Sequence, residues 1–81
     1  MKKKQIPKID LHGHTADEIF DLLDGFIRKH KHQEQVIAIV GKGRGIVKNK
    51  VLEYLKKAHY PWSYEKVRGK TNEGALIIDL F

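Results

Sequence analysis

Two apolar runs in this sequence each end at a glycine and are followed by a segment with helical periodicity. In the first run, residues 8–12, Ile9 and Leu11 alternate with polar residues, which is typical of a half-buried strand. The second run, residues 36–40, is continuous and rich in β-branched residues, which favours an interior parallel strand. Because a helix between two such strands joins them in parallel through a right-handed crossover, the pattern constrains the chain to an α/β fold.

Helices are predicted over residues 16–31 and 46–59, directly behind the two glycine turns. The apolar residues of the first helix recur at helical spacing and form one stripe: Ile19, Leu22, Leu23, Phe26 and Ile27. Ahead of this stripe, Thr15 and Glu18 have the spacing of a capping box. Pro61 ends the second helix.

Two further strands are predicted over residues 62–67 and 75–80, with a polar loop over residues 68–74 between them. The element order is therefore β-α-β-α-β-β, in which the last two strands form a hairpin and the sheet is mixed. We expect residues 8–81 to form one two-layer α/β sandwich with a four-stranded sheet. Residues 1–7, which include three consecutive lysines, are expected to be a basic, disordered tail.

The charge balance favours a polyanionic partner. Lys and Arg number 16 against 10 Asp and Glu, a net charge of +6, which points to nucleic acid first and to an anionic membrane surface second. No apolar run approaches the roughly 20 residues of a membrane span, and none follows Met1 as a secretory signal. The absence of cysteine excludes disulfides and thiolate metal sites and fits a reducing cytoplasm, where we expect the protein.

The segment Gly41-Lys42-Gly43-Arg44-Gly45 is a candidate phosphate-binding loop. Glycine allows backbone N–H groups to approach an anion closely, and Lys42 and Arg44 supply positive charge. The loop leaves a strand at its carboxyl end and enters a helix, as the D-L-H-G segment does. Both should therefore lie at the sheet edge where such folds bind ligands. The spacing is that of neither the nucleotide P-loop nor the dinucleotide-binding fingerprint, and an ordinary turn with incidental cations is the alternative.

Asp10 and His12 are candidate catalytic residues, because residues two apart on a strand point to the same face. The carboxylate can orient the imidazole, and histidine readily exchanges protons near neutral pH. The pair could remove a proton from an RNA 2′-hydroxyl or from water. In the alternative, Asp10 caps the adjacent turn, and His12 is a polar residue whose hydrogen bonds are made within the protein and which has no catalytic role. A metal site of Asp10, His12 and His14 lacks a further fixed ligand, so no resident metal is predicted, and Mg²⁺ dependence is left open.

Two features near the end of the chain have two interpretations each. Arg68 and Lys70 in the polar loop could contact a nucleic-acid backbone or belong to an ordinary hairpin loop. Trp62 and Tyr64 alternate on one strand face, which suits either base stacking or core packing.

Three blocks of these residues together resemble the Smr (small MutS-related) domain family: I-D-L-H-G at residues 9–13, G-K-G-R-G at residues 41–45 and E-G-A-L-I-I-D-L at residues 73–80. The resemblance covers residues 8–81. It implies a fold similar to the C-terminal domain of bacterial translation initiation factor three. It also implies nucleic-acid binding and, in many members, endonuclease activity on DNA, including branched DNA, or on RNA, including messenger RNA on stalled ribosomes. The last of these would associate the protein with the ribosome.

On this resemblance, the acidic residue and the histidine of the family's D-x-H motif correspond to Asp10 and His12. The family's glycine loop and late glycine-rich block correspond to these residues: Gly41, Lys42, Gly43, Gly45, Gly74 and Ala75. Val40 stands where the family often has His or Thr, Lys48 where it often has Arg, and Glu73 near the place of a second glycine. These departures keep the shape and charge of the loop but remove a second catalytic group.

We therefore predict a nucleic-acid-binding domain with endonuclease activity that acts as a monomer on DNA or RNA. Asp10 would orient His12, and His12 would transfer the proton. The expected phosphate-binding residues are Gly13, Gly41, Lys42, Gly43, Arg44, Gly45, Lys48, Arg68 and Lys70. The main alternative is a non-catalytic DNA- or RNA-binding module that uses the same surface. A third is a protein-interaction domain with negligible affinity for nucleic acid.

Overall fold

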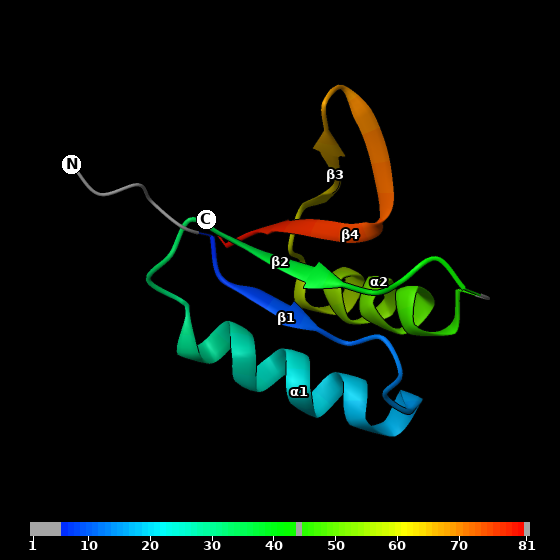
Figure 1. The fold of residues 1–81 in the computed structure, drawn as a ribbon. Helices are drawn as coiled ribbons and strands as arrows, with labels where there is room; N and C mark the ends of the chain where they lie inside the picture. The colour runs from blue at the N-terminus through cyan, green and yellow to red at the C-terminus, as the bar shows by residue number, and fades with distance from the viewer. Residues whose placement is uncertain (1–5, 44, 81) are drawn as a thin grey trace.

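The computed structural model describes residues 6–43 and 45–80, in which two helices and four strands alternate as predicted (Figure 1). The elements are β1 (Lys8–Asp10), α1 (Ala16–Lys29), β2 (Gln35–Ile39), α2 (Ile46–Ala58), β3 (Trp62–Val67) and β4 (Lys70–Asp79). The predicted order β-α-β-α-β-β is confirmed. The expected bounds lie close to the observed ones except at the start of β4. Most of the expected basic tail, residues 1–5, lies outside the described residues.

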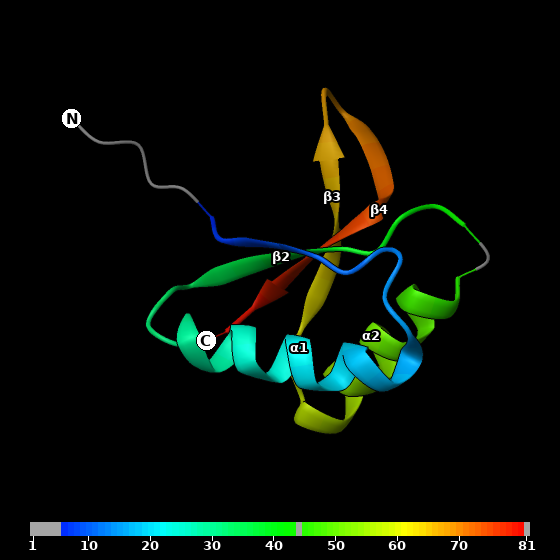
Figure 2. The same ribbon diagram turned by 60° about the horizontal axis from the view of Figure 1, so that its bottom comes forward.

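The strands form one mixed sheet in the order β1-β2-β4-β3. Strands β1 and β2 are parallel, as the crossover through α1 requires, and β4 is antiparallel to both of its neighbours. Both helices lie against one face of the sheet and leave the other face without a helix (Figure 2). The predicted two-layer sandwich with a mixed four-stranded sheet is therefore confirmed.

The core lies between the helices and the sheet. It is formed by apolar residues that are almost completely inaccessible to solvent: Leu11, Ile19, Leu23, Ile27, Val36, Ala38, Val40, Val51, Leu55, Leu76 and Ile78. The two helices are also joined by a hydrogen bond, in which the Tyr54 hydroxyl donates to Asp24 Oδ1 over 2.8 Å. Burial, together with this bond to a carboxylate, raises the pKa of Tyr54. At the start of α1, Thr15 N–H donates to Glu18 Oε1 over 3.0 Å, and this bond lowers the pKa of Glu18.

The prediction of a polar loop over residues 68–74 is wrong. Only Arg68 and Gly69 form the turn, and β4 already begins at Lys70, opposite Val67. Both turn residues have positive φ, 52° and 80°, as a two-residue turn that matches the twist of a hairpin requires. The start of β4 was not recognised because it is polar, and it is polar because it packs against no core.

The hairpin bends where β4 contains extra residues. Tyr64 lies opposite Leu76, but the next residue of β3, Glu65, lies opposite Asn72. Residues 73–75 therefore have no partners on β3 and form a bulge. Beyond the bulge, residues 65–72 form a hairpin arm that rises from the sheet on the side away from the helices (Figure 2).

Candidate nucleic-acid interface

The D-L-H-G segment places Asp10 and His12 in direct contact at the end of β1. Leu11 between them is fully buried and anchors the segment in the core. Asp10 Oδ1 accepts a hydrogen bond of 3.1 Å from the backbone N–H of His12 and lies 2.5 Å from His12 Nδ1. These hydrogen bonds, the side-chain one first, lower the pKa of Asp10. Since the contact uses Nδ1, Nε2 is the ring nitrogen left for proton exchange.

The reason for this contact differs from the predicted one. We expected both side chains on one face of a strand, but β1 ends at Asp10 and His12 lies in the following turn. The Asp10 carboxylate contacts both the backbone of the turn and the imidazole of His12. The two predicted roles of Asp10, capping the turn and orienting His12, are therefore compatible. The His12 side chain is 67% exposed, so its ring is open to a ligand.

The glycine loop after β2 is held in place by the late glycine block of β4. The carbonyl oxygen of Gly74 accepts hydrogen bonds from Val40 N–H (2.8 Å) and Gly41 N–H (3.1 Å). Gly74 N–H in turn donates to Asn72 Oδ1 over 3.0 Å. A Cβ at Gly74 would lie 3.2 Å from Lys42 Cγ, so the close approach of the two segments favours glycine here. The predicted cation Arg44 lies outside the described residues.

The two loops meet at one edge of the sheet, as their topology led us to expect. Gly41 has a φ of 78°, and a Cβ added there would lie 3.3 Å from His12 Cβ. Between the loops is a pocket of about 350 Å³, which we call the apolar pocket. It is lined by His12, Gly13, Val40, Gly41, Lys42, Gly43, Gly45, Ile46 and Val47.

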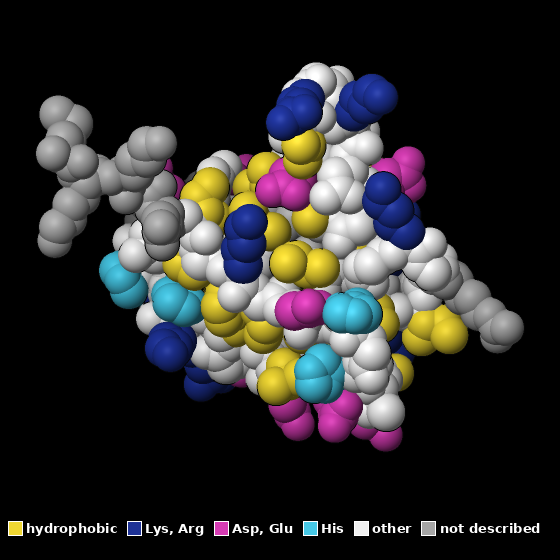
Figure 3. Space-filling model, viewed as in Figure 1, with side chains coloured by type: hydrophobic (Ala, Val, Ile, Leu, Met, Phe, Trp, Pro, Cys, Tyr) yellow, Lys and Arg dark blue, Asp and Glu magenta, His cyan; other side chains and the backbone are white. Residues whose placement is uncertain are grey.

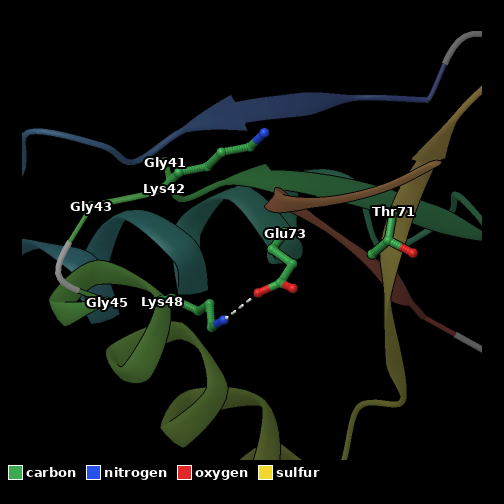
Figure 4. A pocket seen from close by; sticks show the side chains of 7 residues that line it. All are labelled: Gly41, Lys42, Gly43, Gly45, Lys48, Thr71 and Glu73. Atoms are coloured by element: carbon green, nitrogen blue, oxygen red, sulfur yellow. Dashed lines mark ion pairs between the residues drawn. The ribbon is translucent and has the colours of Figure 1, made fainter.

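A second pocket, of about 300 Å³, lies on the other side of the glycine loop, and we call it the polar pocket (Figure 4). It is lined by Gly41, Lys42, Gly43, Gly45, Lys48, Thr71 and Glu73. Figure 4 shows the Lys48 and Glu73 side chains pointing toward one another, and Lys48 Nζ lies 3.5 Å from Glu73 Oε1. Lys48 Nζ also lies 5.1 Å from the centre of the Tyr64 ring. Interactions with Tyr64 first and with Glu73 raise the pKa of Lys48, so this predicted phosphate ligand is a cation that already has a carboxylate partner.

The structure separates Arg68 and Lys70 from the two pockets. Both residues are exposed on the hairpin arm, and Figure 3 shows basic side chains gathered at its projecting end. Lys66 lies directly opposite Thr71, and opposed residues of an antiparallel pair share a face. Lys66 is therefore on the side of the arm that carries Thr71 of the polar pocket.

Sequence reasoning did not assign to the site several residues that line or flank the pockets: Val40, Ile46, Val47, Lys66, Thr71 and Glu73. The first three could have been found, since they directly precede or follow the glycine loop in the sequence. Lys66, Thr71 and Glu73 come to the site only through the pairing of β3 with β4. For Tyr64 the structure favours core packing, because its side chain packs against the core. Trp62 is 37% exposed, and its ring lies edge-on to the Tyr64 ring with 5.2 Å between the ring centres.

Neither a metal cluster nor a membrane-spanning helix is found in the part of the chain that the structure describes. Within residues 6–43 and 45–80, no three His, Cys, Asp or Glu side chains gather as metal ligands. Neither helix in these ranges is long and apolar enough to cross a bilayer.

Comparison of the sequence and the structure with known proteins points in both cases to the Smr domain. The family model described as "Smr domain" matches residues 9–80. The Smr domain of Thermus thermophilus MutS2 superposes with a TM-score of 0.79 at 18% sequence identity, covering 91% of this chain and 96% of that one. The SMR domain of NEDD4-binding protein 2 has a TM-score of 0.62 at 19% identity, covering 100% and 92%. No curated protein sequence matches significantly.

Proposed function

Since this chain belongs to the Smr domain family, a family of nucleic-acid-binding modules, we propose that it is an endonuclease that cleaves DNA or RNA with the Asp10–His12 pair. The observation that carries the proposal is the 2.5 Å contact between Asp10 Oδ1 and His12 Nδ1 beside a glycine loop. A carboxylate on one ring nitrogen fixes the ring and stabilises its charged form, which is what a general base needs.

In the proposed reaction, His12 Nε2 removes a proton from the attacking oxygen, which is the 2′-hydroxyl in RNA or a water molecule. That oxygen bonds to phosphorus while the ester bond to the leaving oxygen breaks. The leaving oxygen then takes up a proton from water, and the protonated His12 ring releases its proton to the solvent. Asp10 stays ionised because its pKa is lowered, and it stabilises the imidazolium during the reaction.

The glycine loop is the proposed phosphate site. Its backbone N–H groups, that of Gly43 among them, lie where a strand leads into a helix, and the N-terminus of α2 favours negative charge. The Gly41 N–H is already bonded to the Gly74 carbonyl and is not counted among them. Lys42 and Arg44 would add charge to the phosphate, and Gly13 would bring the D-L-H-G segment close to it. Further contacts to the backbone are proposed for Lys48, Arg68 and Lys70.

The test is a cleavage assay with labelled single-stranded RNA and with supercoiled plasmid, with and without Mg²⁺. His12→Ala should lower cleavage by about a hundredfold or more, the range expected for loss of a general base. His32→Ala is the matched control, because His32 is also exposed but lies beyond the far end of α1. Equal cleavage by the His12→Ala variant and the wild type would refute the role of His12.

The same samples distinguish the alternatives. A wild type that does not cleave, but whose affinity for nucleic acid falls steeply with added salt, would be a binding module without catalysis. Negligible affinity even at low salt would instead favour a protein-interaction domain.

A further inference from the structure

The apolar pocket contains side chains that phosphate binding does not explain. Val40, Ile46 and Val47 line it together with His12. Ile46 is 60% exposed, the highest value among the large apolar residues of the described chain. Its side chain therefore contributes little to the core, although it stands at the first position of α2 beside the proposed phosphate loop.

The size and position of this pocket limit what it can hold. Its volume of about 350 Å³ is near the lower end of the roughly 300–1,000 Å³ of typical small-molecule sites, which suits one planar ring system. The same four residues, Gly41, Lys42, Gly43 and Gly45, line both this pocket and the polar pocket. A group in the apolar pocket therefore lies next to an anion bound by the loop.

We propose that the apolar pocket binds one unpaired nucleobase of the nucleic acid whose phosphate lies on the glycine loop, with Ile46 packing against the base. The proposal rests on the proposed function, and it specifies the substrate as single-stranded or locally opened nucleic acid. A base paired within a duplex is stacked on both faces and cannot enter the pocket. An unpaired base, whichever of the four it is, presents a flat face that can pack against an apolar side chain.

The test compares two fluorescently labelled DNA strands of equal length, one made of thymidine and one abasic. DNA lacks the 2′-hydroxyl, so it cannot be cut by attack of that group while anisotropy is measured. Both strands carry the same phosphates, so any difference in affinity between them comes from the bases. The wild type should bind the thymidine strand about fivefold more tightly, the effect of burying part of one aliphatic side chain against a base.

Ile46→Ser should remove this preference without changing the affinity for the abasic strand. Ile46→Phe should keep or increase it, because an aromatic ring also packs on a base. Ile6→Ser is the matched control: Ile6 is exposed by 38% and precedes the amino end of β1, whereas the pocket lies beyond the carboxyl ends of β1 and β2. Thermal unfolding followed by circular dichroism checks that each variant is folded.

Three results would overturn the inference. If the wild type binds both strands equally, and both affinities fall steeply with salt, the phosphate site stands and the base pocket is refuted. If the wild type prefers the thymidine strand but Ile46→Ser keeps that preference, bases are bound elsewhere. If neither strand binds in a salt-dependent way, the proposed function fails together with the base pocket.

Discussion

Two glycines of one loop should respond in opposite ways to the same substitution. At Gly41, φ is 78° and an added Cβ would lie 3.3 Å from His12 Cβ. At Gly43, φ lies outside the left-handed region and an added Cβ would meet no atom within 4 Å. Gly41→Ala and Gly43→Ala therefore add the same methyl group to the same loop, but only Gly41→Ala introduces strain.

The expected magnitudes follow from these geometries. A left-handed conformation costs a residue with a Cβ about 1–2 kcal/mol, and the close contact with His12 adds to this. Gly41→Ala should thus lower the free energy of unfolding by about 2 kcal/mol, or Tm by roughly 10 °C for a domain of this size. Gly43→Ala should raise the free energy of unfolding by up to about 1 kcal/mol, because alanine restricts the unfolded chain.

Thermal unfolding and oligonucleotide binding are to be measured on both variants and the wild type. Although Gly43→Ala should be at least as stable as the wild type, its methyl group occupies space near the proposed phosphate, so its affinity should fall. Equal Tm values for Gly41→Ala and Gly43→Ala would refute the strain argument. An unchanged affinity of Gly43→Ala would show that no phosphate approaches the loop at this position.

Three further predictions concern stability and charge. Tyr54→Phe removes the 2.8 Å bond to Asp24 and should lower the free energy of unfolding in urea by about 1 kcal/mol; an unchanged midpoint would mean that the bond contributes nothing. Arg68→Asn suits a turn residue with a φ of 52°, so Tm should be unchanged or higher, while the slope of log affinity against log salt should fall by about one if Arg68 binds a phosphate. Asp10 and Glu18 have pKa values lowered from their ordinary 3.8 and 4.5. Unfolding therefore takes up protons in acid, and the stability that these two groups contribute above about pH 4.5 is lost as the pH falls below it. In Glu18→Gln the free energy of unfolding should fall less between neutral and acid pH than in the wild type, and an equal fall would refute the contribution of Glu18.

The sequence was sufficient to predict every element whose residues pack against the core. The stripe that includes Ile19 and Leu23, the β-branched run of β2 and the Thr15–Glu18 pattern are local signals, and the elements formed where they indicated. The start of β4 carries no such signal. Thr71 and Asn72 lie on an arm without a core, so hydrophobic periodicity could not identify a strand there.

The site was predictable only where its geometry is local. Asp10 and His12 are two residues apart and were paired correctly, although a turn rather than a strand brings them together. The partner of Lys48 could not be anticipated, because Glu73 reaches it only through the bulge and bend of β4. Long-range pairing of this kind depends on register, which composition and spacing do not encode.

The Lys48–Glu73 pair changes where the affinity for phosphate should originate. A phosphate in the polar pocket would have to approach a carboxylate and compete with it for the ammonium group of Lys48. Lys42, in contrast, forms no ion pair within the described residues and lines both pockets. The phosphate should therefore lie along the part of the loop that the two pockets share, where Lys42 and the backbone N–H groups can reach it and where His12 borders the apolar side. In that position the bound nucleotide would extend its base toward Ile46 while its phosphate stays on the side of His12. The Lys48–Glu73 pair would thus place the proposed site nearer to the apolar pocket and to the Asp10–His12 pair.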